Sequence, residues 1–177
     1  MTHAQRIAIQ TVATQLLSHL HVPYLGAMTR CTLRRLVYLA SFGPAGHLLK
    51  DVPFSLGRDM HGDLDILSPM VDAVIDEMLA SGIACPGEQT EIEIGDAGQA
   101  YLASLPRDGD LIATLGQVSR ITSGYEGPYG SRLMALARHY HAEHGEDAPI
   151  ALATDAGARD IVGWTRVLDH ALDTEPA

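Results

Sequence analysis

SPMVDAVIDEMLASGIACPGEQTEIEI, residues 68–94, is the stretch that decides the fold class. Ser68-Pro69 is a helix start, because the serine oxygen can cap free backbone N–H groups and proline tolerates the first helical position. Apolar residues then recur at helical spacing as far as Gly82, a residue type that commonly ends helices. After a Pro-Gly turn, residues 90–94 alternate in the manner of a half-buried strand. A helix followed directly by a two-stranded hairpin predicts a wing.

Helices are predicted on both sides of this unit. Apolar stripes predict one at residues 4–20, one from Tyr24 to about Ser41, and a short one from Asp96 that Pro106 closes. Residues 42–67 hold several Gly and Pro and are predicted as a connector with one helical turn. The fold class is therefore mainly α (α+β), with a small two-stranded wing and additional C-terminal helices.

The chain divides into residues 1–105, the core with its N-terminal helices, and residues 106–177, a helical extension packed on that core as one compact domain. Stripes in the extension predict helices at residues 111–121, where Ile112 belongs to the stripe, 133–140 and 161–172. The last stripe contains Trp164 and is too broad to stay uncovered. We expect it to pack on the helices of its own chain, with a homodimer seam as the alternative.

Composition bounds the class of protein. The chain has 177 residues, of which 46% are hydrophobic and 19% charged, as in ordinary globular domains. No apolar stretch approaches the roughly 20 residues of a membrane helix, and no secretory signal pattern is visible. Cys31 and Cys85 are expected to be buried reduced thiols, so we expect a cytoplasmic protein. The net charge of −10 disfavours nucleic acid, because phosphate backbones are bound mainly by cations.

Four segments resemble the YwgA-type and Panacea-domain (SocA-like) small bacterial proteins. They are TLRRLVYLA at 32–40, FSLGR at 54–58, the helix from Ser68 that ends EMLASGI at 77–83, and IEIGDAGQAYL at 92–102. The resemblance covers about residues 30–105 and implies a winged-helix-like core. Panacea-domain proteins act as antitoxins or adaptors by binding a partner protein, so the resemblance implies a binding function and carries over no catalytic residue. The same helix–hairpin–helix order recurs in PadR- and MarR-like regulators.

The predicted recognition helix is acidic. A helix that reads DNA should present Arg, Lys, Asn or Gln to base edges, whereas this one presents Asp72, Asp76 and Glu77. Glu91 and Glu93 make the wing acidic as well. These five residues are the candidate surface for a protein partner with a basic surface.

The dense basic group of the chain is Arg30, Arg34 and Arg35, and we expect Arg34 and Arg35 to point away from the apolar stripe of their helix. They could bind phosphate or an acidic partner, or form a solvated face that pairs with local carboxylates. A dimer that turned both sets toward DNA would be a transcription regulator, which is the alternative function.

Weaker candidates lie in the extension. His141 and His144 share a helix face and could bind a metal, but a third ligand would have to come from elsewhere. Tyr125 and Tyr129 lie in a Gly-rich loop of the kind that suits protein interfaces. No nucleophile signature is present, and no cofactor is expected. The leading hypothesis is thus a non-catalytic protein-binding regulator of the antitoxin, adaptor or anti-defence kind, and a metal protein or an enzyme is the second alternative.

Overall fold

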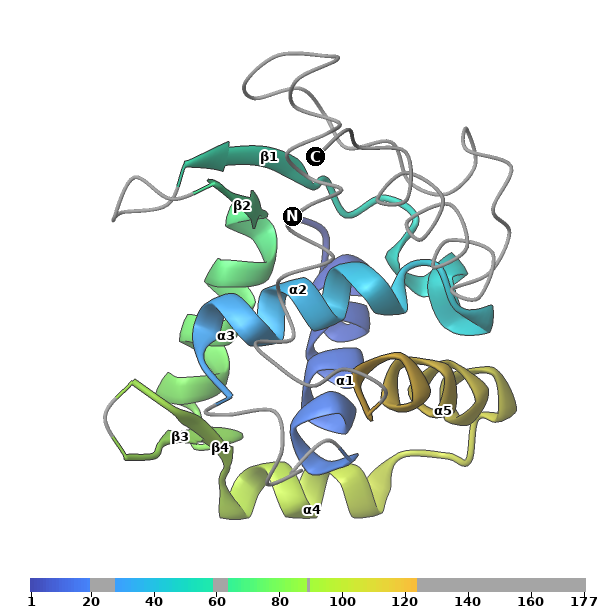
Figure 1. Cartoon of the computed structure of the whole chain (residues 1–177). Helices are drawn as coiled ribbons and strands as arrows, with labels where there is room; N and C mark the ends of the chain where they lie inside the picture. Colours follow the sequence, from blue (N-terminus) through green and yellow to red (C-terminus); the bar gives the residue numbers. More distant parts are fainter. Residues whose placement is uncertain (20–27, 59–63, 89, 124–177) are drawn as a thin grey trace, which may run out of the picture.

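A computed structural model of the chain describes residues 1–19, 28–58, 64–88 and 90–123 (Figure 1). Within these ranges the helices are α1 (His3–His19), α2 (Arg30–Ala40), the 3-10 helix η1 (Pro44–Leu49), α3 (Pro69–Ala80), α4 (Asp96–Ser104) and α5 (Gly109–Ser123). The strands are β1 (Ser55–Arg58) paired antiparallel with β2 (Leu64–Leu67), and β3 (Ala84–Pro86) paired antiparallel with β4 (Ile92–Ile94). The protein is therefore mainly helical with a small wing, as the sequence predicted.

The helix–wing unit forms for the reasons visible in the sequence. The Ser68 hydroxyl accepts a hydrogen bond from the Val71 N–H at 3.4 Å, and Pro69 occupies the first turn of α3. Gly82 ends the helix with a φ of +73°, a conformation that side chains other than glycine rarely adopt. The chain then enters β3 at once, which confirms the predicted hairpin.

An extended segment just before α2 pairs with the wing and adds to its sheet. Met28 accepts a hydrogen bond from the Ile92 N–H at 2.8 Å, and Thr29 forms an antiparallel bridge with Glu91. Thr29 also caps α2, because its hydroxyl accepts from the Thr32 N–H at 3.2 Å. The helix thus begins at Arg30, and the prediction of a start at Tyr24 was wrong because residues 28 and 29 are extended.

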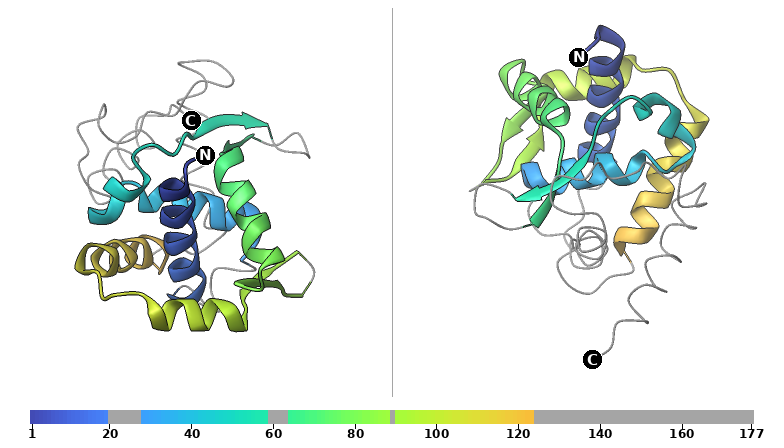
Figure 2. Two further views of the ribbon diagram at one scale, coloured as in Figure 1. Left: turned by 180° about the vertical axis from the view of Figure 1, so that it is seen from behind. Right: turned by 90° about the horizontal axis from the view of Figure 1, so that it is seen from above.

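A second hairpin, β1–β2, separates α2 from α3, where we predicted a connector. Figure 1 and the left view of Figure 2 place this hairpin at the N-terminal end of α3 and the wing at its C-terminal end. The register pairs Gly57 with Asp65 and Leu56 with Ile66. α3 therefore lies between two β-hairpins.

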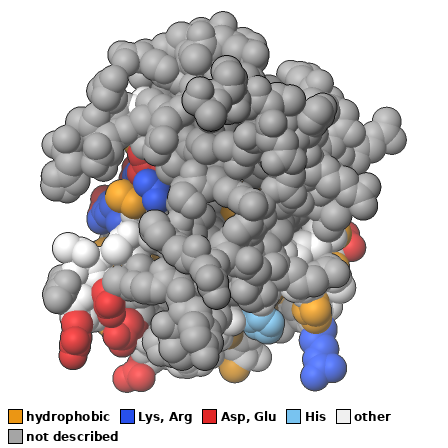
Figure 3. All heavy atoms as spheres, viewed as in Figure 1, with side chains coloured by type: hydrophobic (Ala, Val, Ile, Leu, Met, Phe, Trp, Pro, Cys, Tyr) orange, Lys and Arg blue, Asp and Glu red, His pale blue; other side chains and the backbone are white. Residues whose placement is uncertain are grey.

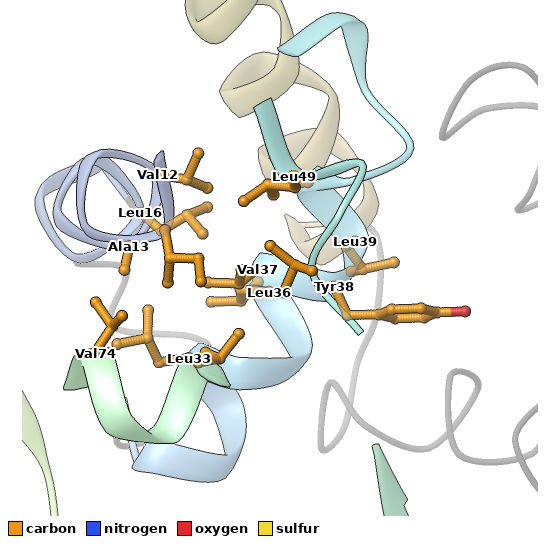
Figure 4. Packing of buried hydrophobic residues seen from close by; sticks show 14 of the residues in the cluster. Val12, Ala13, Leu16, Leu33, Leu36, Val37, Tyr38, Leu39, Leu49 and Val74 are labelled. Atoms are coloured by element: carbon orange, nitrogen blue, oxygen red, sulfur yellow. The ribbon is translucent and has the colours of Figure 1, made fainter. Parts of the chain in front are cut away.

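One hydrophobic core joins the helices. Figure 4 shows side chains of α1, α2, α3 and η1 converging on it, among them Leu16, Leu36 and Leu49. The described part of the predicted extension, α5, contributes Leu111, Leu115 and Val118 to the same core. We had predicted that Ile112 belongs to this stripe. The prediction was wrong, because Ile112 is 58% exposed. The predicted helices at 133–140 and 161–172 lie outside the described residues.

Smaller contacts complete the packing. Tyr38, labelled in Figure 4, belongs to the same core, and its ring packs edge-on against Phe42 and Phe54 at 5.0 and 5.1 Å between centroids. The hydroxyls of Thr11 and Tyr101 are 2.7 Å apart and join α1 to α4. None of the helices in the described ranges has the length and apolar character that a membrane crossing needs.

Candidate functional site: an arginine–aspartate network beside an acidic wing

The candidate site begins with the arginines of α2. Arg34 is only 4% exposed, so it does not lie on the solvated face that was one interpretation of this basic group. Its guanidinium is held from three directions: Nε donates to the Ile66 carbonyl, Nη1 donates to both carboxylate oxygens of Asp72 at 2.9 and 3.0 Å, and Nη2 donates to Asp65 at 2.6 Å. One buried arginine thereby ties α2 to β2 and α3.

Asp65 is the centre of this network and is fully buried. Its Oδ2 accepts from Arg34, while its Oδ1 accepts from Arg35 Nε at 2.7 Å and from the Ile66 N–H at 2.7 Å. An isolated buried carboxylate would be strongly destabilising, whereas one with two guanidinium partners and a backbone donor is satisfied. The sequence analysis missed Asp65. Its signal was an acidic residue inside the apolar run Leu64–Leu67 of a segment that had no predicted partner.

The network reaches the surface at Arg30. Its Nη2 donates to Asp76, and its Nη1 donates to the Asp72 carbonyl at 3.4 Å. The side chains of Arg30 and Asp76 are 38% and 63% exposed, so water screens this pair far more than the Arg34–Asp65 pair. The network thus has a buried part around Asp65 and a solvent-exposed part around Asp76.

The pKa shifts follow from these contacts. The hydrogen bond from Arg30 lowers the pKa of the Asp76 carboxyl, and the same hydrogen bond raises the pKa of Arg30. Burial alone would lower the pKa of Arg34, but attraction to Asp72 and Asp65 outweighs it and raises that pKa. The arginines therefore stay charged inside the network.

Three arginines face three aspartates in this cluster, so its formal charges cancel. Two of the predicted partner-binding residues, Asp72 and Asp76, are consequently paired within the chain. The candidate basic group, Arg30, Arg34 and Arg35, pairs with the same local carboxylates, although Arg34 is buried and not on a solvated face. The sequence had suggested two separate charged patches, and the structure joins the basic patch to two of the five acidic residues in one neutral network.

The remaining predicted acidic residues lie near the C-terminal end of α3 and on the wing. Glu77 is half exposed and lies 3.6 Å from Arg6, a distance at which an exposed pair contributes little. Glu93 is exposed and Glu91 is half-buried, and Glu88 and Asp96 are exposed beside them. Figure 3 shows acidic side chains gathered at the corner that holds β3, β4 and the start of α4. Among the described residues, no arginine or lysine forms a salt bridge with these four wing carboxylates.

The exposed face of α3 is poor in groups that could contact bases. It consists of Pro69, Ala73, Asp76, Glu77 and Ala80. Specific base contacts come mainly from Arg, Lys, Asn and Gln, and none of these types is on that face. α3 therefore lacks the side chains of a DNA recognition helix.

Other predicted candidates fall elsewhere. Tyr125, Tyr129, His141 and His144 lie outside the described residues. Within the described ranges, no group of three or more His, Cys, Asp or Glu is arranged to hold a metal ion. Cys31 and Cys85 are free thiols. We had predicted that both are buried, but each is half-buried.

Comparisons with known proteins give no relative from which a function could be carried over. No family model matches the chain, and neither a curated protein nor a solved structure matches it.

Proposed function

We propose that the chain is a non-catalytic protein-binding regulator of the antitoxin, adaptor or anti-defence kind, which acts in the cytoplasm. Its binding surface would be the acidic wing, formed by Glu88, Glu91, Glu93 and Asp96, together with Glu77 at the adjoining end of α3. The partner would be a protein with a basic surface. The resemblance of residues 30–105 to partner-binding bacterial proteins agrees with this proposal.

The observation that carries the proposal is the difference between the two acidic groups. Asp65, Asp72 and Asp76 are neutralised inside the chain, whereas the wing carboxylates have no cation from the described residues. Unpaired surface charge of one sign steers association with a partner of the opposite sign and raises its rate. The wing is thus a cluster of described carboxylates whose charge is available to a partner.

The DNA-binding alternative has less support. It would use Arg30, Arg34 and Arg35, and each of these guanidiniums already contacts an aspartate. A phosphate would have to displace Asp76 from Arg30, or enter a network that is closed around Asp65.

The proposal is tested by capturing partners from the native host with the tagged full-length chain. The test variant is Glu88→Lys/Glu93→Lys on the wing, where both residues are exposed. The control is Asp51→Lys/Asp110→Lys, which changes two exposed carboxylates away from the wing and alters the net charge equally. We expect one protein that the wild type and the control capture, that the wing variant loses, and that salt releases.

Two results would contradict the proposal. Equal capture by the wing variant and the control would remove the wing from the interface. A gel shift of double-stranded DNA at low salt, lost in Arg30→Met but retained in the wing variant, would favour the transcription-regulator alternative.

A further inference from the structure

α4 is only weakly embedded in the rest of the fold. Of its nine described residues only Gly98 is buried, and no side chain of α4 belongs to the described hydrophobic core. α3, by contrast, buries Val71, Val74, Ile75 and Met78. Figure 1 and the left view of Figure 2 show α4 crossing one end of the molecule between the wing and α5. Elements with few buried apolar contacts are the ones that open locally while the rest of a protein stays folded.

Gly98 and Tyr101 fasten α4 to its neighbours. A Cβ at Gly98 would lie 2.2 Å from the Ile83 carbonyl oxygen and 2.8 Å from Ile94 Cγ1, so only glycine allows this close approach. Further along the helix, the Tyr101 hydroxyl lies 2.7 Å from the Thr11 hydroxyl of α1. Among the described residues, no salt bridge includes a residue of α4.

α4 has little helical stability of its own. Its nine residues are fewer than the about 12–15 that an isolated helix needs in water. Gly98 lies in the interior of the helix, where glycine is unfavourable. The N-cap, Gly95, offers the first turn no side-chain hydrogen bond. The contacts at Gly98 and Tyr101 therefore decide whether α4 is formed.

The chain is anchored in the core on both sides of α4. Ile92 lies before the helix and Leu111 after it, and both are buried members of the hydrophobic core. Residues 95–106 can therefore detach without removing a side chain from the core that joins α1, α2 and α3.

We infer that α4 is a strap, which opens by local unfolding while the rest of the core stays folded and which uncovers Ile94 at the base of the wing. Ile94 follows Glu93 on β4, so the uncovered side chain adjoins the acidic surface. Protein interfaces combine an apolar centre with a polar rim. The strap thus regulates how the partner docks, a step that rests on the proposed function.

Hydrogen exchange followed by mass spectrometry measures the opening in the full-length chain without any partner. We expect the amides of α4 to exchange about ten-fold or more faster than those of α2 and α3. Exchange through local opening is insensitive to low concentrations of urea, whereas exchange through global unfolding accelerates with urea. Low urea should therefore speed exchange in α2 and α3 and leave the rate in α4 unchanged.

Gly98→Ala and Tyr101→Phe loosen the strap at its two fastenings. The added Cβ collides with the Ile83 carbonyl, and the phenylalanine ring lacks the hydroxyl that meets Thr11. Each variant should raise the exchange rate of α4 several-fold and leave α2 and α3 unchanged. The matched control is Gly109→Ala, which should alter none of these rates, because a Cβ at Gly109 has no atom within 4 Å.

The strap is ruled out if α4 exchanges at the rate of α2 and α3 in the wild type. It is also ruled out if Gly98→Ala and Tyr101→Phe accelerate all helices equally, because α4 then unfolds only together with the core. In capture from the native host, Gly98→Ala should retain several-fold more of the partner proposed for the wing than Gly109→Ala. Equal capture would remove the regulatory role, whereas capture of no partner by the wild type would contradict the proposed function and leave the hydrogen-exchange result standing.

Discussion

Asp65 and Arg34 form a salt bridge of 2.6 Å between side chains that are 0% and 5% exposed, and this pair fastens β2 to α2. Removing one partner of a buried pair costs about 3–5 kcal/mol when the other charge is left without compensation. Asp72 still compensates Arg34 here, so the cost should lie at the lower end of that range, about 3 kcal/mol. We therefore expect Asp65→Ala to lower the free energy of unfolding by about that amount in urea denaturation.

The matched control for this prediction removes both charges. Arg34→Met/Asp65→Leu should recover most of the loss, because buried ion pairs can often be replaced by apolar residues of similar volume. Arg35 and Asp72, whose side chains are 21% and 28% exposed, can then turn to water. A double variant less stable than Asp65→Ala would show that the network does more than neutralise Asp65.

The exposed end of the network should show in the acid titration of Asp76. The carboxyl has an ordinary pKa of 3.8, and the hydrogen bond from Arg30 lowers it in the folded chain. The pair therefore stabilises the fold above the unfolded pKa and loses that contribution as the pH falls through the folded pKa. Because the pair is largely exposed, the contribution should stay below about 1 kcal/mol.

Carboxyl NMR titration measures this shift directly. Arg30→Met should return the pKa of Asp76 toward 3.8 while the unfolding free energy at neutral pH changes little. An unchanged pKa in Arg30→Met would mean that another group perturbs Asp76.

The Cys31 thiol should react slowly at neutral pH. Burial, and then the negative charge of Asp65, raise the pKa of this thiol above its ordinary value of 9.0. Alkylation proceeds through the thiolate, so fewer molecules are reactive at any pH below the raised pKa. In Cys85→Ser, the rate of reaction with iodoacetamide should rise with an inflection above pH 9.0, and the same chain in urea should react faster. An inflection below that value would contradict the described position of Cys31.

Local signals in the sequence were sufficient for the helix–wing unit. Ser68 caps α3, Gly82 ends it and the Pro-Gly turn opens the wing, and each of these effects acts between residues close along the chain. The apolar stripes likewise located α1, α4 and α5. The error at the start of α2 arose because Thr29, a good N-cap, was passed over in favour of an apolar pattern from Tyr24.

The β1–β2 hairpin could not be predicted in this way, because its stability is not local. Its strands have four residues each, β1 contains Gly57, and β2 places Asp65 in the interior. Acidic residues are depleted in strands, and an aspartate is tolerated inside only with partners. Those partners, Arg34 and Arg35, lie about 30 residues earlier. The same long-range pairing explains why the sequence suggested separate acidic and basic surfaces.

Thr114 joins α5 to η1, and a comparison with Thr14 isolates that contact. Both threonines are fully buried in helices, and both hydroxyls donate to the carbonyl four residues earlier, Asp110 at 2.8 Å and Gln10 at 2.6 Å. The Thr114 hydroxyl also accepts a hydrogen bond from the Ala45 N–H at 2.8 Å. Among the described residues, no backbone N–H donates to Thr14 in the same way.

Replacing Thr114 by the isosteric valine leaves the buried Ala45 donor unsatisfied, which costs about 1–3 kcal/mol. Thr14→Val leaves only a carbonyl that the helix itself can satisfy. Urea denaturation should therefore show a loss of about 1–3 kcal/mol for Thr114→Val and a much smaller change for Thr14→Val, and equal losses would mean that the bond to η1 contributes nothing.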